Sequence, residues 1–200
     1  MNAREEETFK LSKLERIFYL DRLGFNTPVF IEKISDLSNL TSFYDKKKGN
    51  KVSIRTQGKD VLGPHFPNIK LDKIIFKQLC STLRKGYELL IFEPINPLKA
   101  LQRGTIWIDR KLERVTVEYS ELPGTVREME LMNRKEISIL EKPFNELLRR
   151  SEGKYSFIGY PFSKYLEIPL NSFIIEFSKM PRPVGRKKMN YIFWEIRYGG

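Results

Sequence analysis

The sequence predicts an α+β fold, with an α/β arrangement as the alternative. Helix-like and strand-like segments alternate through the first half of the chain, and strand pairs joined by short turns are frequent in the second half. The chain has 200 residues, of which 40% are hydrophobic and 12% aromatic, so it can form the core of one domain, or of one domain in two lobes.

Three helices are expected in the first half of the chain. The first spans Ser12 to Arg22, because Ser12 and Glu15 have the spacing of a capping box and Gly24 follows the last apolar turn. The other elements follow from apolar periodicity and turn residues. They are a strand at 29–32, a helix at 36–46, a strand at 52–56, a helix at 71–84 and a strand at 89–93.

The second half is expected to be rich in paired strands. Residues 104–109 and 114–119 have the pattern of a β-hairpin, and residues 122–127 form a glycine turn at Gly124 that is followed by Arg127. The segment 155–170 has no clear period. The remaining elements are one helical turn at 98–102, a helix at 143–150, and two closing strands at 173–177 and 191–197, joined by a basic connection at 180–188.

Each closing strand carries one carboxylate within an apolar segment. Side chains alternate between the two faces of a strand, so Glu195 and Arg197 share a face. Strict alternation adds Tyr191 and Phe193 to that face, and assigns Ile192, Trp194 and Ile196 to the other. In the partner strand Glu176 faces away from Phe173, Ile175 and Phe177.

Two interpretations of these charged residues remain open. If the strands pair, Glu176, Glu195 and Arg197 converge on one surface, and such a group suits Mg²⁺ and phosphate. Alternatively, Glu195 and Arg197 form an ordinary ion pair on a half-exposed strand.

The net charge of +11 predicts an anionic partner, either a nucleotide, a nucleic acid or a membrane surface. The basic residues are scattered, apart from short runs at 46–48 and 186–188, which favours a small phosphate ligand over a long polymer. No apolar stretch is long enough to span a membrane, and the polar N-terminus is unlike a signal peptide, so a cytoplasmic location is expected.

The cysteine and histidine content limits the chemistry further. With Cys80 and His65 as the only residues of their types, a disulfide within the chain is excluded and a zinc site is not expected. Cys80 lies at an apolar helix position and is interpreted as a buried thiol. His65 lies in a loop rich in Gly and Pro, where it is either a turn or surface residue or a participant in phosphoryl transfer.

Three separated segments, in chain order, resemble the nucleotide-binding domain of the phosphoenolpyruvate synthase and pyruvate phosphate dikinase family, a branch of the ATP-grasp proteins. Lys13 precedes a Leu-Gly-Phe-Asn-Thr-Pro segment at 23–28, and Val-Ser-Ile-Arg-Thr follows at 52–56. Ile-Ile-Glu-Phe at 174–177 and Trp-Glu-Ile-Arg at 194–197 are similar to the strands that end the family's ATP site. Between these segments, residues 90–93 and 104–107 resemble the family's paired strands beside the adenine.

This resemblance implies an ATP-grasp-like fold, with two small α/β lobes whose mixed and antiparallel sheets enclose a cleft. A single domain would span 1–200, with an N-terminal lobe at about 1–87 and a C-terminal lobe at about 88–200. The implied cofactors are ATP and Mg²⁺. The implied activity is that of a phosphotransferase or ligase, acting on a small-molecule or macromolecular acceptor that the sequence does not identify.

The resemblance also implies roles for individual residues. As catalytic residues, Arg55 and Arg197 would position and neutralise phosphate, and a planar guanidinium suits phosphate oxygens. The residues that the resemblance implies for the site are Lys13 and Arg55 at the nucleotide phosphates, Arg197 at the γ-phosphate, Glu176 and Glu195 at Mg²⁺, and Glu93 near the adenine.

The sequence departs from the family pattern at several positions. Lys13 lacks the flanking glycines, Ile174 replaces an aspartate, and Glu195 replaces a glutamine. The family's phosphohistidine and phosphoenolpyruvate domains are not represented in these residues. The complete dikinase or synthase reaction is therefore not implied, and a domain that binds nucleotide without catalysis is an alternative.

A second hypothesis is a nucleic-acid-associated binding module without catalytic activity. It depends on the charge of +11 and on basic residues close to aromatic ones, as in the segment 186–194. Such a combination can bind phosphates and stack on bases. Most of the aromatic residues, however, are expected at buried strand positions.

Overall fold

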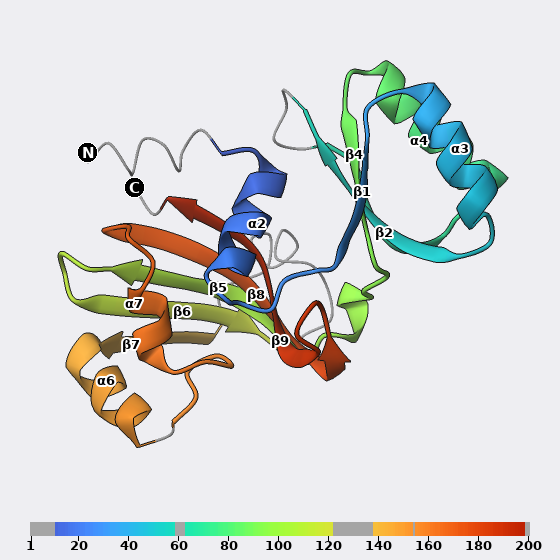
Figure 1. Cartoon of the computed structure of the whole chain (residues 1–200). Helices are drawn as coiled ribbons and strands as arrows, with labels where there is room; N and C mark the ends of the chain where they lie inside the picture. Colours follow the sequence, from blue (N-terminus) through green and yellow to red (C-terminus); the bar gives the residue numbers. More distant parts are fainter. Residues whose placement is uncertain (1–10, 59–62, 122–137, 154, 199–200) are drawn as a thin grey trace. The chain divides into compact units, whose positions relative to one another are not determined.

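The computed structural model describes residues 11–58, 63–121, 138–153 and 155–198. The expected turn at 122–127 lies outside these ranges. Contacts divide the chain into two compact units, which Figure 1 shows together. Unit 1 comprises Met1–Thr27 and Leu98–Gly200, and unit 2 comprises Pro28–Pro97.

Unit 2 is a four-stranded antiparallel sheet packed against two helices. The strand order is β1 (Phe30–Ile34), β4 (Glu88–Phe92), β2 (Lys51–Gln57) and β3 (His65–Lys70). The helices are α3 (Leu37–Lys47) and α4 (Lys73–Arg84), and the side chains of Asp36 and Asp72 cap their N-termini. The core between sheet and helices consists of Ile34, Leu40, Phe43, Tyr44, Val52, Ile54, Leu71, Leu79, Leu83, Leu89 and Ile91.

Strand β3 was not expected, because its residues suggested a loop. The prediction that His65 lies in a loop is wrong, since His65 is the first residue of β3 and its Cα pairs with that of Arg55. At the edge of a sheet a strand tolerates a proline such as Pro67. The register of β2 against β3 shifts between Val52 and Ile54, which obscured the alternating pattern of the strand.

Unit 1 is a five-stranded antiparallel sheet with helices on one face and along one edge. The strand order is β7 (Ser138–Pro143), β6 (Arg114–Ser120), β5 (Gln102–Asp109), β8 (Ser172–Val184) and β9 (Met189–Tyr198). The helices are α2 (Lys13–Arg22), α6 (Phe144–Glu152) and α7 (Phe162–Leu166), and a single 3-10 turn, η1 (Pro97–Lys99), precedes β5.

One face of this sheet is covered by α6, α7 and the segment between them (Figure 1). Ile106 and Ile108 of β5 point into this core, so Arg103, Thr105 and Trp107 point to the opposite face. Helix α2 packs against the edge strand β9. The expected capping box is present, because Ser12 and Glu15 each bond the other's backbone N–H.

The segment after α2 is held against the β8–β9 hairpin by the buried side chain of Asn26. Its Nδ2 donates to the carbonyl oxygens of Val184 at 2.9 Å and Tyr191 at 2.7 Å. Its Oδ1 accepts from the backbone N–H of Lys187 at 2.7 Å. The backbone oxygen of Asn26 accepts from Phe193 N at 2.8 Å. These bonds join residues that are more than 150 positions apart, and so place α2 beside β9.

The hairpin connection is shorter than expected, because β8 continues to Val184 and β9 begins at Met189. Gly185 has a φ of +76°. A Cβ atom there would lie 2.7 Å from Oδ1 of Asn26 and 2.8 Å from the backbone oxygen of Thr27. Glycine is therefore required both by the backbone conformation and by the close approach of the Asn26 segment.

A β-bulge interrupts the alternation of β9. Glu176 pairs with Glu195 and Phe177 pairs with Phe193, so Trp194 is the extra residue of the bulged strand. The Nε1 of Trp194 donates to Oγ of Ser178 at 2.9 Å.

The bulge corrects the expected distribution of side chains. Phe193 and Ile196 both belong to the buried core, although an odd number of positions separates them. The prediction that Phe193 shares a face with Glu195 is therefore wrong, as is the grouping of Ile196 with Trp194 and Ile192. Strict alternation could not reveal this, because one inserted residue reverses the faces of all residues beyond it.

Candidate functional site

The candidate site is the face of the unit 1 sheet that lies opposite the core. Its centre is the pair Glu176 and Glu195, whose Cα atoms are direct partners across β8 and β9. Residues that pair across antiparallel strands point to the same face, and Phe173, Ile175 and Phe177 of β8 point to the other face, into the core. The expected pairing of the two glutamates is therefore confirmed.

Each of these carboxylates forms an ion pair with a different arginine. The Nη2 of Arg197 lies 2.5 Å from Oε1 of Glu176, and the Nη1 of Arg16 lies 3.1 Å from Oε1 of Glu195. The glutamate side chains are 15% and 11% exposed, and the arginine side chains 37% and 23%. The structure thus pairs Arg197 with Glu176 across the strands, and Glu195 with helix α2.

Arg16 was not identified from the sequence. It is the fourth residue of α2, and its Nε also donates to the backbone oxygen of Leu11 at 3.0 Å. Lys13 is the first residue of the same helix, three positions earlier, and residues three apart lie on neighbouring parts of one helix face. The capping box predicts where the helix begins, and the three-residue spacing then puts Arg16 on the same helix face as the predicted site residue Lys13. These two features of the sequence could have revealed Arg16.

The site face continues onto β5. Thr105 pairs with Glu176, and Arg103 pairs with Ser178 on the same face. Arg103 is only 2% exposed, so the face includes a buried arginine next to β8, the strand that carries Glu176. Arg103 was not identified from the sequence, because it lies one residue before the predicted hairpin arm at 104–109, whereas β5 begins at Gln102.

Two of the predicted site residues lie in unit 2. Arg55 is in the middle of β2, partly buried, and its Cα pairs with those of His65 and Leu90. Glu93 follows β4, and its backbone N–H donates to Val29 O at 2.9 Å. The structure thus brings Lys13, Glu176, Glu195 and Arg197 into one unit and places Arg55 and Glu93 in the other. Their roles at a nucleotide remain predictions.

The charges of the site suit an anion together with a divalent cation. Glu176 and Glu195 can supply carboxylate oxygens, and Mg²⁺ in nucleotide sites takes one or two carboxylates together with phosphate oxygens. Within the described ranges, no group of three or more His, Cys, Asp or Glu side chains is arranged to hold a metal on its own. The Nε of Arg197 is buried and has no hydrogen-bond acceptor among the described atoms.

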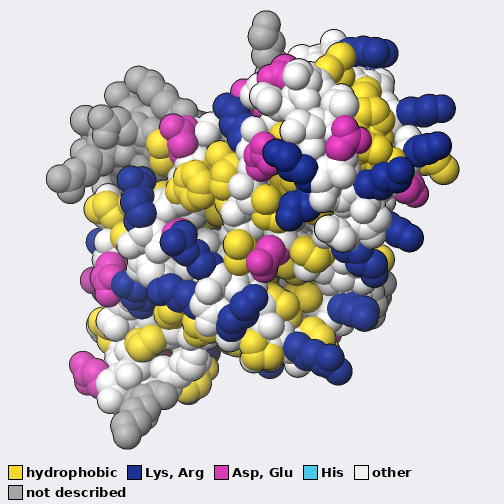
Figure 2. Space-filling model, turned by 45° about the vertical axis from the view of Figure 1, so that its right-hand side comes forward, with side chains coloured by type: hydrophobic (Ala, Val, Ile, Leu, Met, Phe, Trp, Pro, Cys, Tyr) yellow, Lys and Arg dark blue, Asp and Glu magenta, His cyan; other side chains and the backbone are white. Residues whose placement is uncertain are grey.

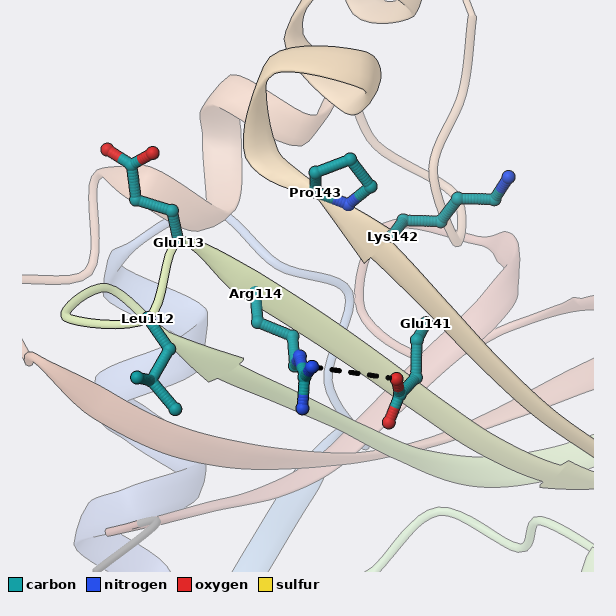
Figure 3. Close-up of a pocket in the computed structure, with 6 residues that line it drawn as sticks. All are labelled: Leu112, Glu113, Arg114, Glu141, Lys142 and Pro143. Carbon is teal, nitrogen blue, oxygen red and sulfur yellow. Dashed lines mark ion pairs between the residues drawn. The ribbon is translucent and has the colours of Figure 1, made fainter.

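A shallow pocket of about 260 Å³ lies elsewhere on unit 1 (Figure 3). It is lined by the β5–β6 turn and by β7, at the opposite edge of the sheet from β9. Its charged residues include Arg114 and Glu141, which lie 4.0 Å apart. Most of its lining is exposed and it shares no residue with the site described above, so it is a separate surface feature. The lining residues are Leu112, Glu113, Arg114, Glu141, Lys142 and Pro143.

This chain is similar to known proteins in its fold, not in its sequence. No protein-family model matches the chain, and no curated protein sequence matches it. Solved structures do match. The macrocyclase MdnC from Microcystis aeruginosa MRC, bound with the precursor peptide MdnA, aligns with a TM-score of 0.55 at 14% identity, over 99% of this chain and 55% of that one.

Two further solved structures belong to ATP-grasp ligases. The RiPP-associated ATP-grasp ligase of Chryseobacterium gregarium, in complex with ADP and a leader and core peptide, aligns with a TM-score of 0.54 at 12% identity, over 100% of this chain and 54% of that one. The ATP-grasp ligase PsnB, complexed with a variant of its minimal precursor, Mg and ADP, gives a TM-score of 0.51 at 10% identity, over 99% of this chain and 51% of that one.

The protein therefore has an ATP-grasp-like α+β fold, as the sequence predicted. The chain spans about half the length of the ligases that it matches. Among the described residues, no helix is both long and apolar enough to cross a membrane. The matches do not favour the alternative of a nucleic-acid-binding module, and they do not specifically support the phosphoenolpyruvate synthase branch.

Proposed function

We propose that this protein binds Mg·ATP and acts as an ATP-grasp-type ligase on an acceptor that carries a carboxylate. The observation that carries this proposal is the pair Glu176 and Glu195, each joined to an arginine on the face of the sheet opposite the core, in an ATP-grasp-like fold. Carboxylates beside guanidinium groups are the side chains that a metal–phosphate complex requires.

The residues of unit 1 would hold the phosphate end of the nucleotide. Glu176 and Glu195 would coordinate Mg²⁺, and Arg197 would contact the γ-phosphate through its planar guanidinium. Lys13 would add a compact positive charge at the phosphates. In the structure both carboxylates are engaged by arginines, so binding of the metal would exchange these ion pairs for bonds to Mg²⁺ and would release both guanidinium groups toward phosphate.

The residues of unit 2 complete the proposed assignment. Arg55 would bind the phosphates and help to neutralise charge during transfer, and Glu93 would lie near the adenine. The assignment of these two residues depends on the sequence resemblance.

The proposed reaction class is supported by the likeness in fold to the matched ligases and by the chemistry of ATP. Transfer of the γ-phosphoryl group of Mg·ATP to the carboxylate would form an acyl phosphate and leave ADP. Attack of a nucleophile on the acyl carbon would then release phosphate. The matched ligases include proteins solved with precursor peptides, with ADP and with Mg, so a peptide is one acceptor class to test. Direct transfer to another acceptor, as in the phosphoenolpyruvate synthase branch, is the related alternative that the sequence resemblance supports.

Thermal unfolding tests the proposal directly. Mg·ATP should raise the Tm, because a ligand that binds only the folded state at one hundred times its Kd adds about 2.7 kcal/mol of stability. The double variant Glu176→Gln/Glu195→Gln should lose this shift. The matched control, Glu113→Gln/Glu141→Gln, changes two exposed carboxylates at the far edge of the sheet and should keep it. Absence of a shift in the wild-type protein at millimolar Mg·ATP would contradict the proposal.

A further inference from the structure

One end of unit 2 carries a dense group of exposed lysines that the proposed nucleotide site does not use. They come from the end of α3, the start of β2, the end of β3 and the first turns of α4. Figure 2 shows many Lys and Arg side chains projecting from the face of the molecule in view. This lysine cluster consists of Lys46, Lys47, Lys48, Lys51, Lys70, Lys73 and Lys77, all exposed.

Three contacts bring these four chain segments together. The rings of Tyr44 and Phe76 lie 4.5 Å apart and join the last turn of α3 to the first turn of α4. The backbone N–H of Gly49 donates to Leu71 O at 2.9 Å. The Cα atoms of Lys51 and Lys70 pair directly across β2 and β3. The seven charges therefore gather at one end of a single packed unit.

The lysines of the cluster outnumber the two carboxylates that adjoin them in sequence, Asp45 and Asp72. None of the seven lysines forms an ion pair with any residue in the described ranges. Asp72, the nearest carboxylate in sequence to Lys73, is occupied as the cap of α4 and accepts from the N–H groups of Ile74 and Ile75. Like charges directly opposite each other, as at Lys51 and Lys70, destabilise a sheet. The cluster is thus a feature that the stability of the fold does not explain.

An apolar side chain lies within the cluster. Ile74 is 68% exposed, follows Lys73 directly and precedes Lys77 by three positions on the same helix. Residues three apart on a helix are surface neighbours, so Ile74 and Lys77 lie side by side. The surface therefore offers positive charge around an exposed apolar contact.

We infer that the lysine cluster is a docking surface for an acidic peptide segment that carries apolar side chains. Glutamates or aspartates of such a segment would contact the lysines, and an apolar residue would pack on Ile74. The cluster contains no arginine, whose planar fork is the preferred partner of phosphate groups.

Other polyanions fit the surface less well. Of the large hydrophobic side chains in the described ranges, the exposed aromatic ones are Phe18, Trp107 and Tyr155, all in unit 1. The exposed imidazole of His65 belongs to unit 2 but lies in β3, outside the cluster, so the cluster itself contains no ring on which a base could stack. A membrane-bound helix presents a continuous apolar face, whereas α4 exposes one isoleucine between lysines. A peptide uses both the charge and the single apolar contact.

Fluorescence anisotropy with defined probes tests this inference. A short labelled peptide of repeating Glu-Glu-Leu units should bind the full-length protein, and its affinity should fall as salt is raised. Its Lys-Lys-Leu counterpart should not bind. The double variant Lys70→Glu/Lys73→Glu should lower the affinity by about tenfold or more, because it reverses two charges at the centre of the cluster. The matched control Lys99→Glu/Lys111→Glu, at exposed lysines of unit 1, should bind as the wild type does.

The apolar contact is tested separately with Ile74→Ser. This variant should weaken binding of the Glu-Glu-Leu peptide but leave binding of an all-glutamate peptide unchanged. The inference is overturned if the Glu-Glu-Leu peptide fails to bind, or if it binds both double variants equally. It is also overturned if a DNA oligonucleotide or phosphatidylserine vesicles bind more tightly than the peptide and lose that binding in Lys70→Glu/Lys73→Glu. None of these measurements includes ATP, so their outcome does not depend on whether the proposed ATP site exists.

Discussion

Nη1 of Arg16 lies 3.1 Å from Oε1 of Glu195, which joins helix α2 to the edge strand β9 at the other end of the chain. The same guanidinium donates through Nε to Leu11 O and so fixes the segment that leads into the helix. Glu195 is thereby held in place beside Glu176 on the site face.

Replacement of Arg16 by alanine should therefore alter both stability and the proposed metal site. We expect a loss of about 1 kcal/mol in the free energy of unfolding, because the pair is partly buried. A double-mutant cycle with Glu195→Gln, followed by urea unfolding, measures the coupling energy of the pair. Arg16→Lys retains the charge and should retain part of that energy. A coupling energy of zero would show that the ion pair does not contribute to folding.

Asn26 is expected to be among the most sensitive positions of unit 1. Its side chain is buried and bonds four backbone groups of the hairpin, at Val184, Lys187, Met189 and Tyr191. Asn26→Ala leaves these buried groups without partners and should destabilise the protein by about 2–4 kcal/mol, since each unsatisfied group costs roughly 1–3 kcal/mol and part of the loss is relieved by water. Chemical denaturation measures this change. Asn190→Ala, which removes an amide bonded to Met180 O from an exposed residue of the same hairpin, is the control and should cost about 1 kcal/mol or less.

The β-bulge predicts different results for two neighbouring aromatic residues. Phe193→Ala removes a fully buried ring from the core and should cost about 3–5 kcal/mol. Trp194 is only partly buried, although it is the larger residue, so Trp194→Ala should cost less. Equilibrium unfolding of the two variants makes the comparison. If the order were reversed, the bulge would be misplaced and the strict alternation of β9 would be restored.

Glu88 should make the stability of unit 2 depend on pH in the acidic range. The hydrogen bond from Lys33, at 2.8 Å, lowers the pKa of this carboxyl below its ordinary value of 4.5, and bonds from Ser35 and Gln57 act in the same direction. Because the pKa is lower in the folded state, the contribution is present above the pKa of the unfolded state and is lost as the pH falls through the folded pKa.

A comparison of Glu88→Gln with the wild type tests this dependence. The wild type should be the more stable protein at neutral pH, and the difference should disappear in acid below the folded pKa. A difference that stays constant across the acidic range would show that Glu88 acts through packing or uncharged hydrogen bonds. Titration of the Glu88 carboxyl by NMR gives the pKa itself.

The described helices and strands could largely be predicted from local patterns. The capping box of α2, the two closing strands and the β5–β6 hairpin follow from periodicity and turn residues, and all are present. Strand β3 was missed because Gly63, Pro64 and Pro67 are typical of loops, and an edge strand tolerates a proline. The turn residues are present in that segment, but antiparallel pairing with β2 overrides their signal.

The candidate site could be predicted only in part. Glu176, Glu195 and Arg197 were identified because a charge within an apolar strand is visible in the sequence. Their actual partners were not, because the Arg16–Glu195 pair spans 179 positions and depends on where α2 packs. The same limit applies to Arg103, whose burial no local pattern indicates.

By itself, the sequence determined the α+β class, the capping of α2 and the presence of two carboxylates in paired strands, because these depend on side-chain spacing along a short stretch of chain. Only the tertiary structure decided that a bulge at Trp194 sends Phe193 into the core, that Arg16 and Arg197 each hold one of the glutamates, and that seven lysines from four segments gather at one end of unit 2. These features depend on contacts between residues far apart in the chain, whose geometry is set by the packing of whole elements.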